Sequence, residues 1–142
     1  MKLTTKGRYA VMAMADLAAN QDLKPVSLSD ISLRQNISLS YLEQLFSKLK
    51  SKKLVKSTRG PSGGYLLEKN PKDIKISNII FAVDEQVRTL NCKKESKKGC
   101  QGRTVKCITH HLWEDLEEHI NGFFDNVSLD DLTKQKRTEQ IK

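Results

Sequence analysis

A short run of turn-forming residues constrains the fold of this chain more than any other feature. Residues 59–64 read Arg-Gly-Pro-Ser-Gly-Gly, and stretches with the apolar character of strands flank them at 54–58 and 65–67. Glycine and proline at this density favour a tight reversal between two antiparallel strands. The sequence therefore predicts a β-hairpin near the middle of a chain of 142 residues.

Three short helices are predicted before this hairpin. Apolar residues recur at helical spacing over 5–20, and Ser27, with an acidic residue three positions later, opens a helix over about 28–35. Ser40 and Glu43 have the spacing of a full capping box that opens a third helix. Three helices followed by a β-hairpin form a winged helix, whose second and third helices are the helix-turn-helix. The predicted fold class is mainly α with a small β-wing.

The second half of the chain predicts two further helices. A linker at 69–73 leads to a helix at about 76–83, and a long last helix is predicted over about 108–125. One face of the last helix is an apolar stripe, formed by Leu112, Leu116, Ile120, Phe123 and Val127. Such a stripe can cover the winged helix, but a long helix with so broad an apolar face also suits a second copy of the chain. We expect a C-terminal dimerisation helix.

The positive charge is concentrated in the first half of the chain. The net charge is +8, and residues 1–67 hold 11 lysines or arginines against 4 acidic residues. A merely solvated basic surface is one interpretation, and a surface that binds nucleic-acid phosphates is the other. A helix-turn-helix in the same half favours DNA. The residues expected to make sequence-independent phosphate contacts are Lys48, Lys50, Lys52, Lys53 and Lys56.

The beginning of the third helix offers side chains that can read bases. A recognition helix enters the major groove with its N-terminus first. The candidates in that region are Ser38, Ser40, Tyr41, Glu43, Gln44, Ser47 and Lys48. Helix capping is the alternative role for Ser40 and Glu43. Phosphates repel Glu43 unless it accepts from a cytosine amino group, so we expect it to select against sites without that donor. Arg59, at the base of the hairpin, is expected to enter a minor groove, against the alternative of a solvated turn residue.

All three cysteines lie in one polar, lysine-rich segment. Together with a histidine they place four metal-binding side chains within 19 residues: Cys92, Cys100, Cys107 and His110. An odd number of clustered cysteines indicates a metal site more than a disulfide framework. The spacing matches neither zinc ribbons nor ferredoxins, so zinc and a [2Fe–2S] cluster both remain open. The net charge of +5 over 91–107 favours an anionic cluster slightly, and His111 competes with His110 as fourth ligand.

Other function classes fit the sequence less well. A thiol enzyme with Cys107 and His110 as its catalytic pair would need oxyanion-hole glycines and a substrate pocket, and no signature of either accompanies them. A DNA-binding protein with structural zinc, or with a thiol-redox-sensing site, is the alternative to a cluster sensor. No stretch is long and apolar enough to span a bilayer, and the N-terminus has no hydrophobic signal region. We expect a cytoplasmic regulator that is not an enzyme.

Several long motifs follow one another along the chain: residues 3–11, 37–46, 59–67 and 82–85, and Cys107-Ile108-Thr109-His110 with Leu112-Trp113. In this order they resemble the IscR family of bacterial iron–sulfur cluster regulators over essentially the whole length. The resemblance implies a homodimeric winged-helix repressor and activator that receives its cluster from the iron–sulfur assembly machinery. In that family the cluster-bound form represses its own cluster-assembly operon, and the cluster-free form binds a second class of sites.

The resemblance also assigns residues to roles. It implies a [2Fe–2S] cluster on Cys92, Cys100, Cys107 and His110. The DNA contacts, on a pseudo-palindromic operator, map onto Ser38, Ser40, Tyr41, Gln44 and Arg59, with Glu43 as the selectivity residue. The expected organisation is a winged helix-turn-helix DNA-binding domain at 1–67, a linker and helix at 68–91, a cluster-binding loop at 92–110, a dimerisation helix at 108–127 and a C-terminal segment at 128–142.

Overall fold

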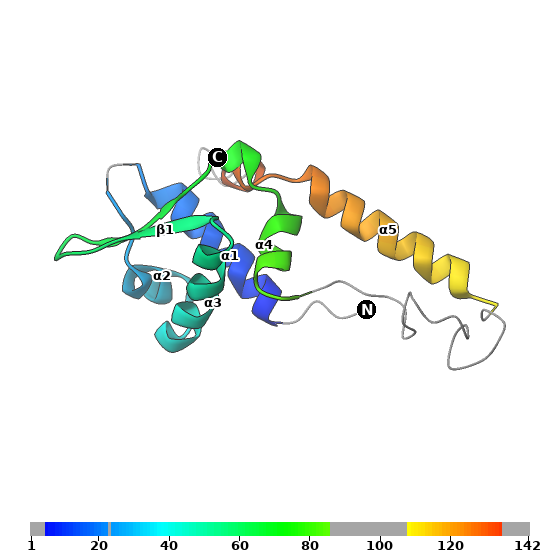
Figure 1. The fold of residues 1–142 in the computed structure, drawn as a ribbon, viewed down its shortest axis with the longest axis horizontal. Helices are drawn as coiled ribbons and strands as arrows, with labels where there is room; N and C mark the ends of the chain where they lie inside the picture. Colours follow the sequence, from blue (N-terminus) through cyan, green and yellow to red (C-terminus); the bar gives the residue numbers. More distant parts are fainter. Residues whose placement is uncertain (1–4, 23, 86–107, 135–142) are drawn as a thin grey trace, which may run out of the picture.

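The computed structural model of the chain describes residues 5–22, 24–85 and 108–134. Its elements are, in order, α1 (Thr5–Asn20), α2 (Leu28–Gln35), α3 (Leu39–Ser51), β1 (Val55–Thr58), β2 (Gly64–Leu67), the 3-10 turn η1 (Pro71–Asp73), α4 (Ile76–Ala82) and α5 (His110–Asn126). Figure 1 shows α1 to α4 and the hairpin gathered into one body, with α5 extending away from it. The predicted fold class, mainly α with a small β-wing, is confirmed.

Helix α1 is the platform of this body. Its buried side chains Ala10, Ala13, Met14 and Leu17 recur every three or four residues, so one side of the helix enters the core. This helix contacts α2, α3, α4 and β2. The two helices of the helix-turn-helix are therefore positioned against the same support.

Two serine caps define the helix-turn-helix. The hydroxyl of Ser27 accepts a hydrogen bond from the Asp30 N–H at 3.1 Å, as the sequence predicted. Helix α2 ends at Asn36, whose left-handed backbone (φ 55°) reverses the chain. The hydroxyl of Ser38 then accepts from the Tyr41 N–H at 3.1 Å and caps α3.

The capping box predicted at Ser40 and Glu43 is wrong. Helix α3 begins at Leu39, so Ser40 already lies inside its first turn. The buried side chain of Ile37 anchors the turn, and the extended backbone of Ser38 (φ −61°, ψ 138°) aims its hydroxyl at the free N–H groups of the helix. Ser40 and Glu43 are consequently exposed side chains of α3 with no part in the cap.

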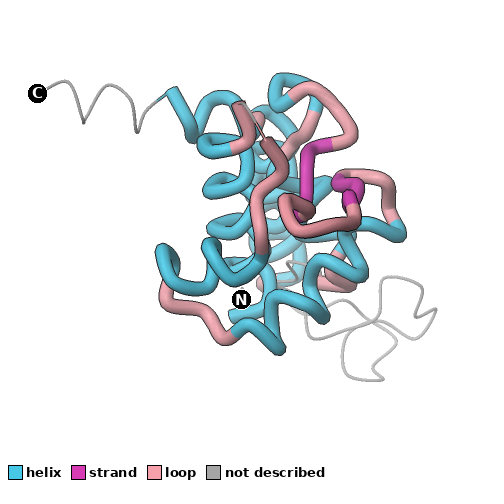
Figure 2. Tube along the Cα trace, turned by 90° about the vertical axis from the view of Figure 1, so that its left-hand side faces the viewer, coloured by secondary structure: helices cyan, strands magenta, loops and turns pink. Residues whose placement is uncertain are grey.

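The wing is an antiparallel pair that is tied to the turn before α2. Val55 lies opposite Leu67 at the base of the hairpin, and both are buried. Tyr65 exchanges two backbone hydrogen bonds with Val26, at 2.7 and 2.9 Å. A Cβ atom on Gly64 would lie 2.5 Å from the Val26 carbonyl oxygen, so only glycine permits this approach. Figure 2 shows the two strands at one side of the helical body.

The hydrophobic core continues beyond residue 67, where the sequence placed the end of the DNA-binding domain. Ile74, Ile79 and Val83 are fully buried together with core residues of α1 and α3. Helix α4 packs against α1 and also contacts α3 and α5. The wing ends near 67, but the segment up to Val83 shares one core with the three preceding helices.

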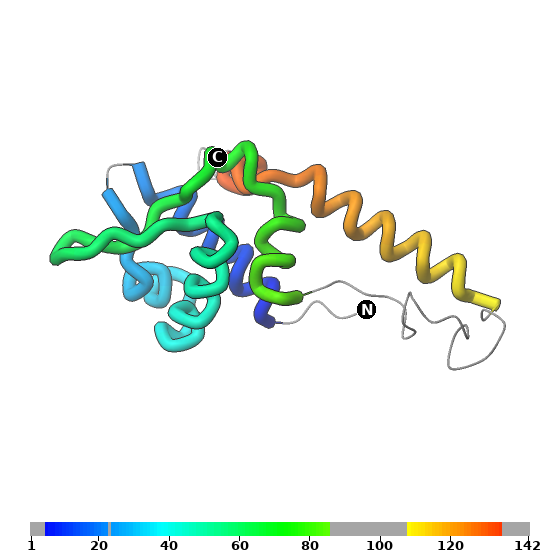
Figure 3. Tube along the Cα trace, viewed as in Figure 1, coloured from blue at the N-terminus to red at the C-terminus, as the bar shows by residue number. Residues whose placement is uncertain are grey.

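Helix α5 is attached to the body through its C-terminal end. The Ile76 N–H donates to the Val127 carbonyl at 2.9 Å, the Leu129 N–H donates to the Ile74 carbonyl at 2.8 Å, and Leu129 is fully buried. Residues 129–134 are helical, and the Ser128 hydroxyl caps this segment by accepting from the Asp131 N–H at 3.2 Å. Figure 3 shows the N-terminal end of α5 as its part farthest from the body. Within the described ranges, no helix has the length and apolar character to cross a membrane.

Candidate DNA interface and metal ligand

The exposed side of α3 carries most of the predicted base-reading residues. A surface hollow of 490 Å³ is lined by five side chains, here called the α3 face: Ser40, Glu43, Gln44, Ser47 and Lys48. They share one side of the helix because residues three and four positions apart are neighbours. The opposite side is held in the core by Leu42, Leu45, Phe46 and Leu49. The structure thus gathers these polar groups on one surface, while their contact with DNA stays a prediction.

Two predicted DNA contacts outside the α3 face, Ser38 and Tyr41, have structural roles. Ser38 is exposed, and its hydroxyl is the cap of α3. Tyr41 is half-buried, and its ring meets the ring of Tyr9 edge-on with centroids 5.8 Å apart. This aromatic pair links the first turn of α3 to α1. Tyr41 therefore helps to position the recognition helix.

Basic side chains lie on α3 and on the wing beside it. Arg59 directly follows β1 and is exposed, and the next residue, Gly60, has a left-handed backbone (φ 115°) that turns the hairpin. Lys50 Nζ donates to the Ser57 hydroxyl at 2.7 Å, which joins α3 to the wing. Lys52, Lys53 and Lys56 are exposed as well. The predicted phosphate-binding lysines thus surround the junction of α3 and β1.

A cluster of three charged residues borders the α3 face. Lys48 Nζ lies 3.2 Å from Asp84 Oδ2, at the end of α4. Hydrogen bonding to Lys48 lowers the pKa of Lys6 on α1, with desolvation and charge repulsion adding to the effect. Hydrogen bonds to Lys6 and Asp84 raise the pKa of Lys48. The ammonium group of Lys48 is therefore paired with a carboxylate from α4, with a second lysine from α1 nearby.

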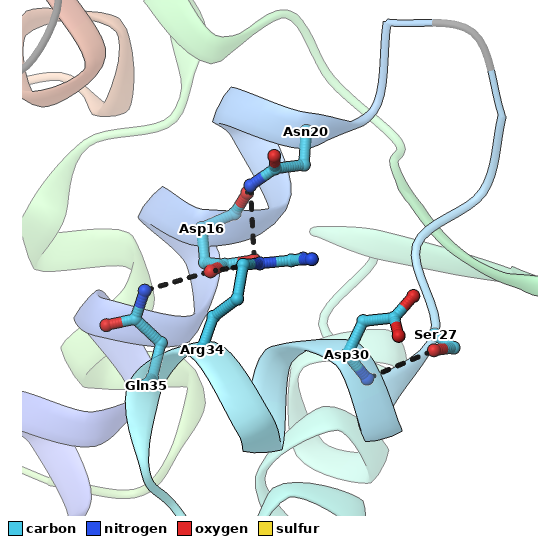
Figure 4. Close-up of polar contacts among 6 residues, drawn as sticks. All are labelled: Asp16, Asn20, Ser27, Asp30, Arg34 and Gln35. Atoms are coloured by element: carbon cyan, nitrogen blue, oxygen red, sulfur yellow. Dashed lines mark hydrogen bonds and ion pairs between the residues drawn. The ribbon is translucent and has the colours of Figure 1, made fainter.

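A buried carboxylate joins α1 to α2 behind the helix-turn-helix (Figure 4). Asp16 Oδ1 accepts from Arg34 Nη2 at 2.7 Å, and Asp16 Oδ2 accepts from Arg34 Nε at 2.9 Å and from Gln35 Nε2 at 2.8 Å. Asn20 Nδ2 donates to the Asp16 backbone carbonyl at 2.8 Å. The hydrogen bond to Asp16 raises the pKa of Arg34. This two-pronged pairing fixes the angle at which α2 crosses α1.

His110 is the predicted metal ligand that the structure describes. It is the first residue of α5, and its side chain is only 11% exposed, whereas the side chain of the adjacent His111 is 78% exposed. Glu114 Oε2 lies 3.7 Å from His110 Nε2 and 3.7 Å from His111 Nδ1. Cys92, Cys100 and Cys107 lie outside the described residues. Among the residues that are described, no three His, Cys, Asp or Glu side chains gather into a possible metal site.

Three features of this region were not predicted from the sequence: two contacts between distant residues and the cap of α3. The pairing of Asp16 with Arg34 joins residues 18 positions apart, and no local pattern reveals such a contact. Lys6 and Asp84 likewise meet Lys48 only through the packing of α1, α3 and α4. One local signal was present for the cap of α3, since Ser38 directly follows the turn at Asn36 and Ile37.

Comparison with known proteins finds relatives along almost the whole chain. Residues 3–135 match the Rrf2 family, described as iron-dependent transcriptional regulators. The chain is 54% identical to the HTH-type transcriptional regulator IscR of Klebsiella pneumoniae over 136 residues, which are 96% of this chain and 82% of that protein. It is 53% identical to the protein of the same name from Escherichia coli over 141 residues, or 99% of this chain and 85% of that protein.

Solved structures of similar proteins share the fold. IscR of T. potens superposes with a TM-score of 0.79 at 36% identity, covering 99% of this chain and 91% of that one. CymR of B. subtilis, named as a global cysteine regulator, superposes with a TM-score of 0.79 at 31% identity, covering 95% and 98%. The arrangement of winged helix and long α5 is therefore similar to that of solved transcription regulators.

Proposed function

The chain belongs to the Rrf2 family of iron-dependent transcriptional regulators, and we propose that a [2Fe–2S] cluster controls which DNA sites it binds. It is a winged-helix transcription regulator and not an enzyme. The proposed targets are iron–sulfur cluster assembly genes, and the proposed donor of the cluster is the assembly machinery, in the cytoplasm. The single observation that supports the proposed DNA interface is the exposed α3 face beside the basic wing.

The side chains of α3 and the wing divide the work of DNA recognition. Ser40, Glu43 and Gln44 would face base edges in the major groove, and Arg59 would enter the adjacent minor groove. The N–H groups at the start of α3 and the Ser38 hydroxyl would contact a phosphate. The exposed lysines of α3 and β1 add contacts that do not depend on sequence. Because Glu43 has no part in the cap, its carboxylate is available to select against sites without a suitable donor.

A second copy of the chain is the proposed occupant of the apolar side of α5. Leu112, Leu116 and Phe123 are 59%, 38% and 64% exposed, although they lie in the apolar stripe. The helix leans away from the body in Figure 1, and among the described residues of α5 and its end, Phe124 and Val127 are the apolar side chains that pack on the core. A twofold partner would cover this stripe and present two recognition helices to a pseudo-palindromic operator.

The proposed ligands of the cluster are Cys92, Cys100, Cys107 and His110. Three thiolates and one imidazole are a donor set that iron accepts, and Cys107 precedes His110 by three residues. The burial of His110 and the exposure of His111 support His110 as fourth ligand. When bound, the cluster supplies an anionic, redox-active centre within the lysine-rich segment. His110 is the first residue of α5, at the end farthest from the body. A cluster bound to His110 would therefore act on the helix that we propose as the dimer contact.

The decisive test of the cofactor is purification without oxygen, followed by assay of iron and acid-labile sulfide. We expect a coloured protein with about equal amounts of iron and sulfide and a visible absorption band. A colourless protein that contains zinc would support the alternative of a structural zinc site. Iron without sulfide would exclude the cluster and would leave an iron-dependent regulator of another kind.

The DNA interface is tested with Arg59→Ala in a quantitative mobility-shift titration. We expect the variant to lose about 1–3 kcal/mol of binding free energy if the guanidinium reads a groove. Lys69→Ala, which removes an exposed cation beyond β2, is the matched control and should change affinity little. Unchanged affinity of the Arg59 variant would remove that residue from the interface.

A further inference from the structure

The cluster of Lys6, Lys48 and Asp84 has a role that neither the α3 face nor the wing explains. Lys48 belongs to the α3 face, yet its ammonium group is paired with Asp84 at 3.2 Å. A lysine that we propose as a contact for a DNA phosphate is therefore already paired with a carboxylate of the protein. Lys6, which lies against Lys48, adds a second cation from the first turn of α1.

The backbone presents Asp84 to this site in a defined way. The Asp84 N–H donates to the Phe81 carbonyl at 3.1 Å, and the Glu85 N–H donates to the Ile80 carbonyl at 3.2 Å. This pair of bonds is the Schellman ending of a helix. Val83 and Ile80 beside it are buried in the core. Asp84 thus extends from a fixed helix end and is no part of a freely moving loop.

The choice of residue at this helix end is informative. Asp84 has a left-handed backbone (φ 60°), a position at which glycine avoids steric cost. Aspartate tolerates this conformation but gains nothing from it over glycine. A carboxylate at this position is therefore explained by its contact with Lys48 and not by the turn itself.

We propose that Asp84 competes with a DNA phosphate for Lys48, so that binding DNA requires this ion pair to open. The pair can exchange, because Lys48 is 40% exposed and Asp84 is 68% exposed, and exposed ion pairs are weak. A DNA phosphate and the Asp84 carboxylate each carry one negative charge, so the phosphate can replace the carboxylate as the partner of the Lys48 ammonium group. This competition rests on the proposed DNA interface and adds a control element to it.

The test is a fluorescence-anisotropy titration of the full-length, cluster-free protein with a labelled DNA duplex of mixed sequence at several salt concentrations. We expect Asp84→Asn to bind several-fold more tightly, since asparagine keeps the left-handed turn but not the charge. The salt dependence should also become steeper. When the wild-type pair opens, the freed carboxylate takes up a cation, which offsets part of the counterion release from DNA. The variant lacks this offset, so the log–log slope of its affinity against salt concentration should be steeper than that of the wild type.

Two comparisons separate competition from a general effect of charge. In a Lys48→Gln background, Asp84→Asn should give no further gain in affinity. Asp73→Asn, which removes an exposed carboxylate on η1, should leave affinity and slope unchanged. An equal gain from Asp73→Asn, a gain that persists without Lys48, or no gain at all from a folded Asp84→Asn protein would each overturn the proposal. Failure of the wild-type protein to bind the duplex would overturn the DNA interface itself and the competition with it.

Discussion

Asp16 and Arg34 show how a single polar contact orients the helix-turn-helix. The carboxylate of Asp16 is 1% exposed and accepts from both donors on one edge of the guanidinium. Replacing Arg34 by leucine would leave that charge buried with fewer donors, so we expect a loss of about 2–4 kcal/mol in the free energy of unfolding. Urea denaturation followed by circular dichroism measures it. Arg59→Leu makes the same change at an exposed site and should cost little; equal losses would contradict the assigned role of Asp16.

Glu43 is the residue at which repulsion should set specificity. Because Ser38 caps α3, removing the Glu43 carboxylate should leave the helix intact and broaden the set of sequences bound by cluster-free protein. Selection from a pool of randomised duplexes, compared with the wild type, measures that breadth. Glu68→Ala removes an exposed carboxylate next to β2 and should not change the selected sequences. Uniformly altered affinity without broader selection would show that Glu43 acts only through its charge.

At the scale of elements, α5 is the helix whose apolar side has the least cover from the body. Leu116→Asp would place a charge in the proposed dimer contact, and we expect it to convert dimers into monomers in sedimentation experiments. Leu33→Asp is the control, since Leu33 on α2 is 83% exposed and outside that contact. A Leu116 variant that remains dimeric and folded would exclude α5 as the principal dimer contact.

The helical turn after α5 depends on a charged cap. The Ser128 backbone N–H donates to Asp131 Oδ2 at 2.9 Å, and this interaction lowers the pKa of Asp131 below its usual value of 3.8, with the Ser128 side chain adding to the effect. The Ser128 hydroxyl in turn accepts from the Asp131 N–H at 3.2 Å. A carboxyl whose pKa is depressed by folding stabilises the folded state above its unfolded pKa, and loses this effect as pH falls through the folded pKa. Asp131→Asn should therefore be less stable than wild type near neutral pH, with the difference disappearing in acid. Thermal unfolding across the acid range checks this; a difference that does not change with pH would contradict it.

At the scale of the whole molecule, α5 lies between the cysteine segment and the body. It follows the cysteine segment in the sequence, and the residues after its C-terminal end pack on the body. The paired variants His110→Ala and His111→Ala test this connection, because they remove the same side chain at adjacent positions. We expect His110→Ala to lose the visible spectrum of the cluster and His111→Ala to retain it. Both should remain folded, since the core of α1 to α4 and Leu129 contains neither residue. Loss of colour only in the His111 variant would move the fourth ligand by one residue.

Loss of the cluster should have a selective effect on DNA binding. The α3 face and the wing belong to the body, and His110 is not among the residues of its hydrophobic core. We therefore expect the His110 variant to be impaired only at sites that require the cluster. The sequence alone predicts this selective effect, because the cysteines and the recognition helix lie in separate stretches of the chain.

Local interactions were readable from the sequence by itself. Helical spacing, the Ser27 cap and the run of turn residues at 59–64 act within a few residues, so they predicted three helices and a hairpin in the right order. The apolar stripe predicted a long last helix for the same reason. The cap of α3 was misplaced because Ser38 and Ser40 are both good caps, and the burial of Ile37 anchors the turn so that the helix begins directly after Ser38.

Contacts between distant residues were decided by the tertiary structure alone. The core extends to Val83 and Leu129 because α4 packs on α1, and this packing leaves no boundary in the sequence. The same packing brings Asp84 to Lys48, and the crossing of α1 and α2 brings Arg34 to Asp16. Sequence determined the elements of this protein, since they depend on neighbours along the chain. Structure decided which charges meet, because that depends on the angles at which those elements pack.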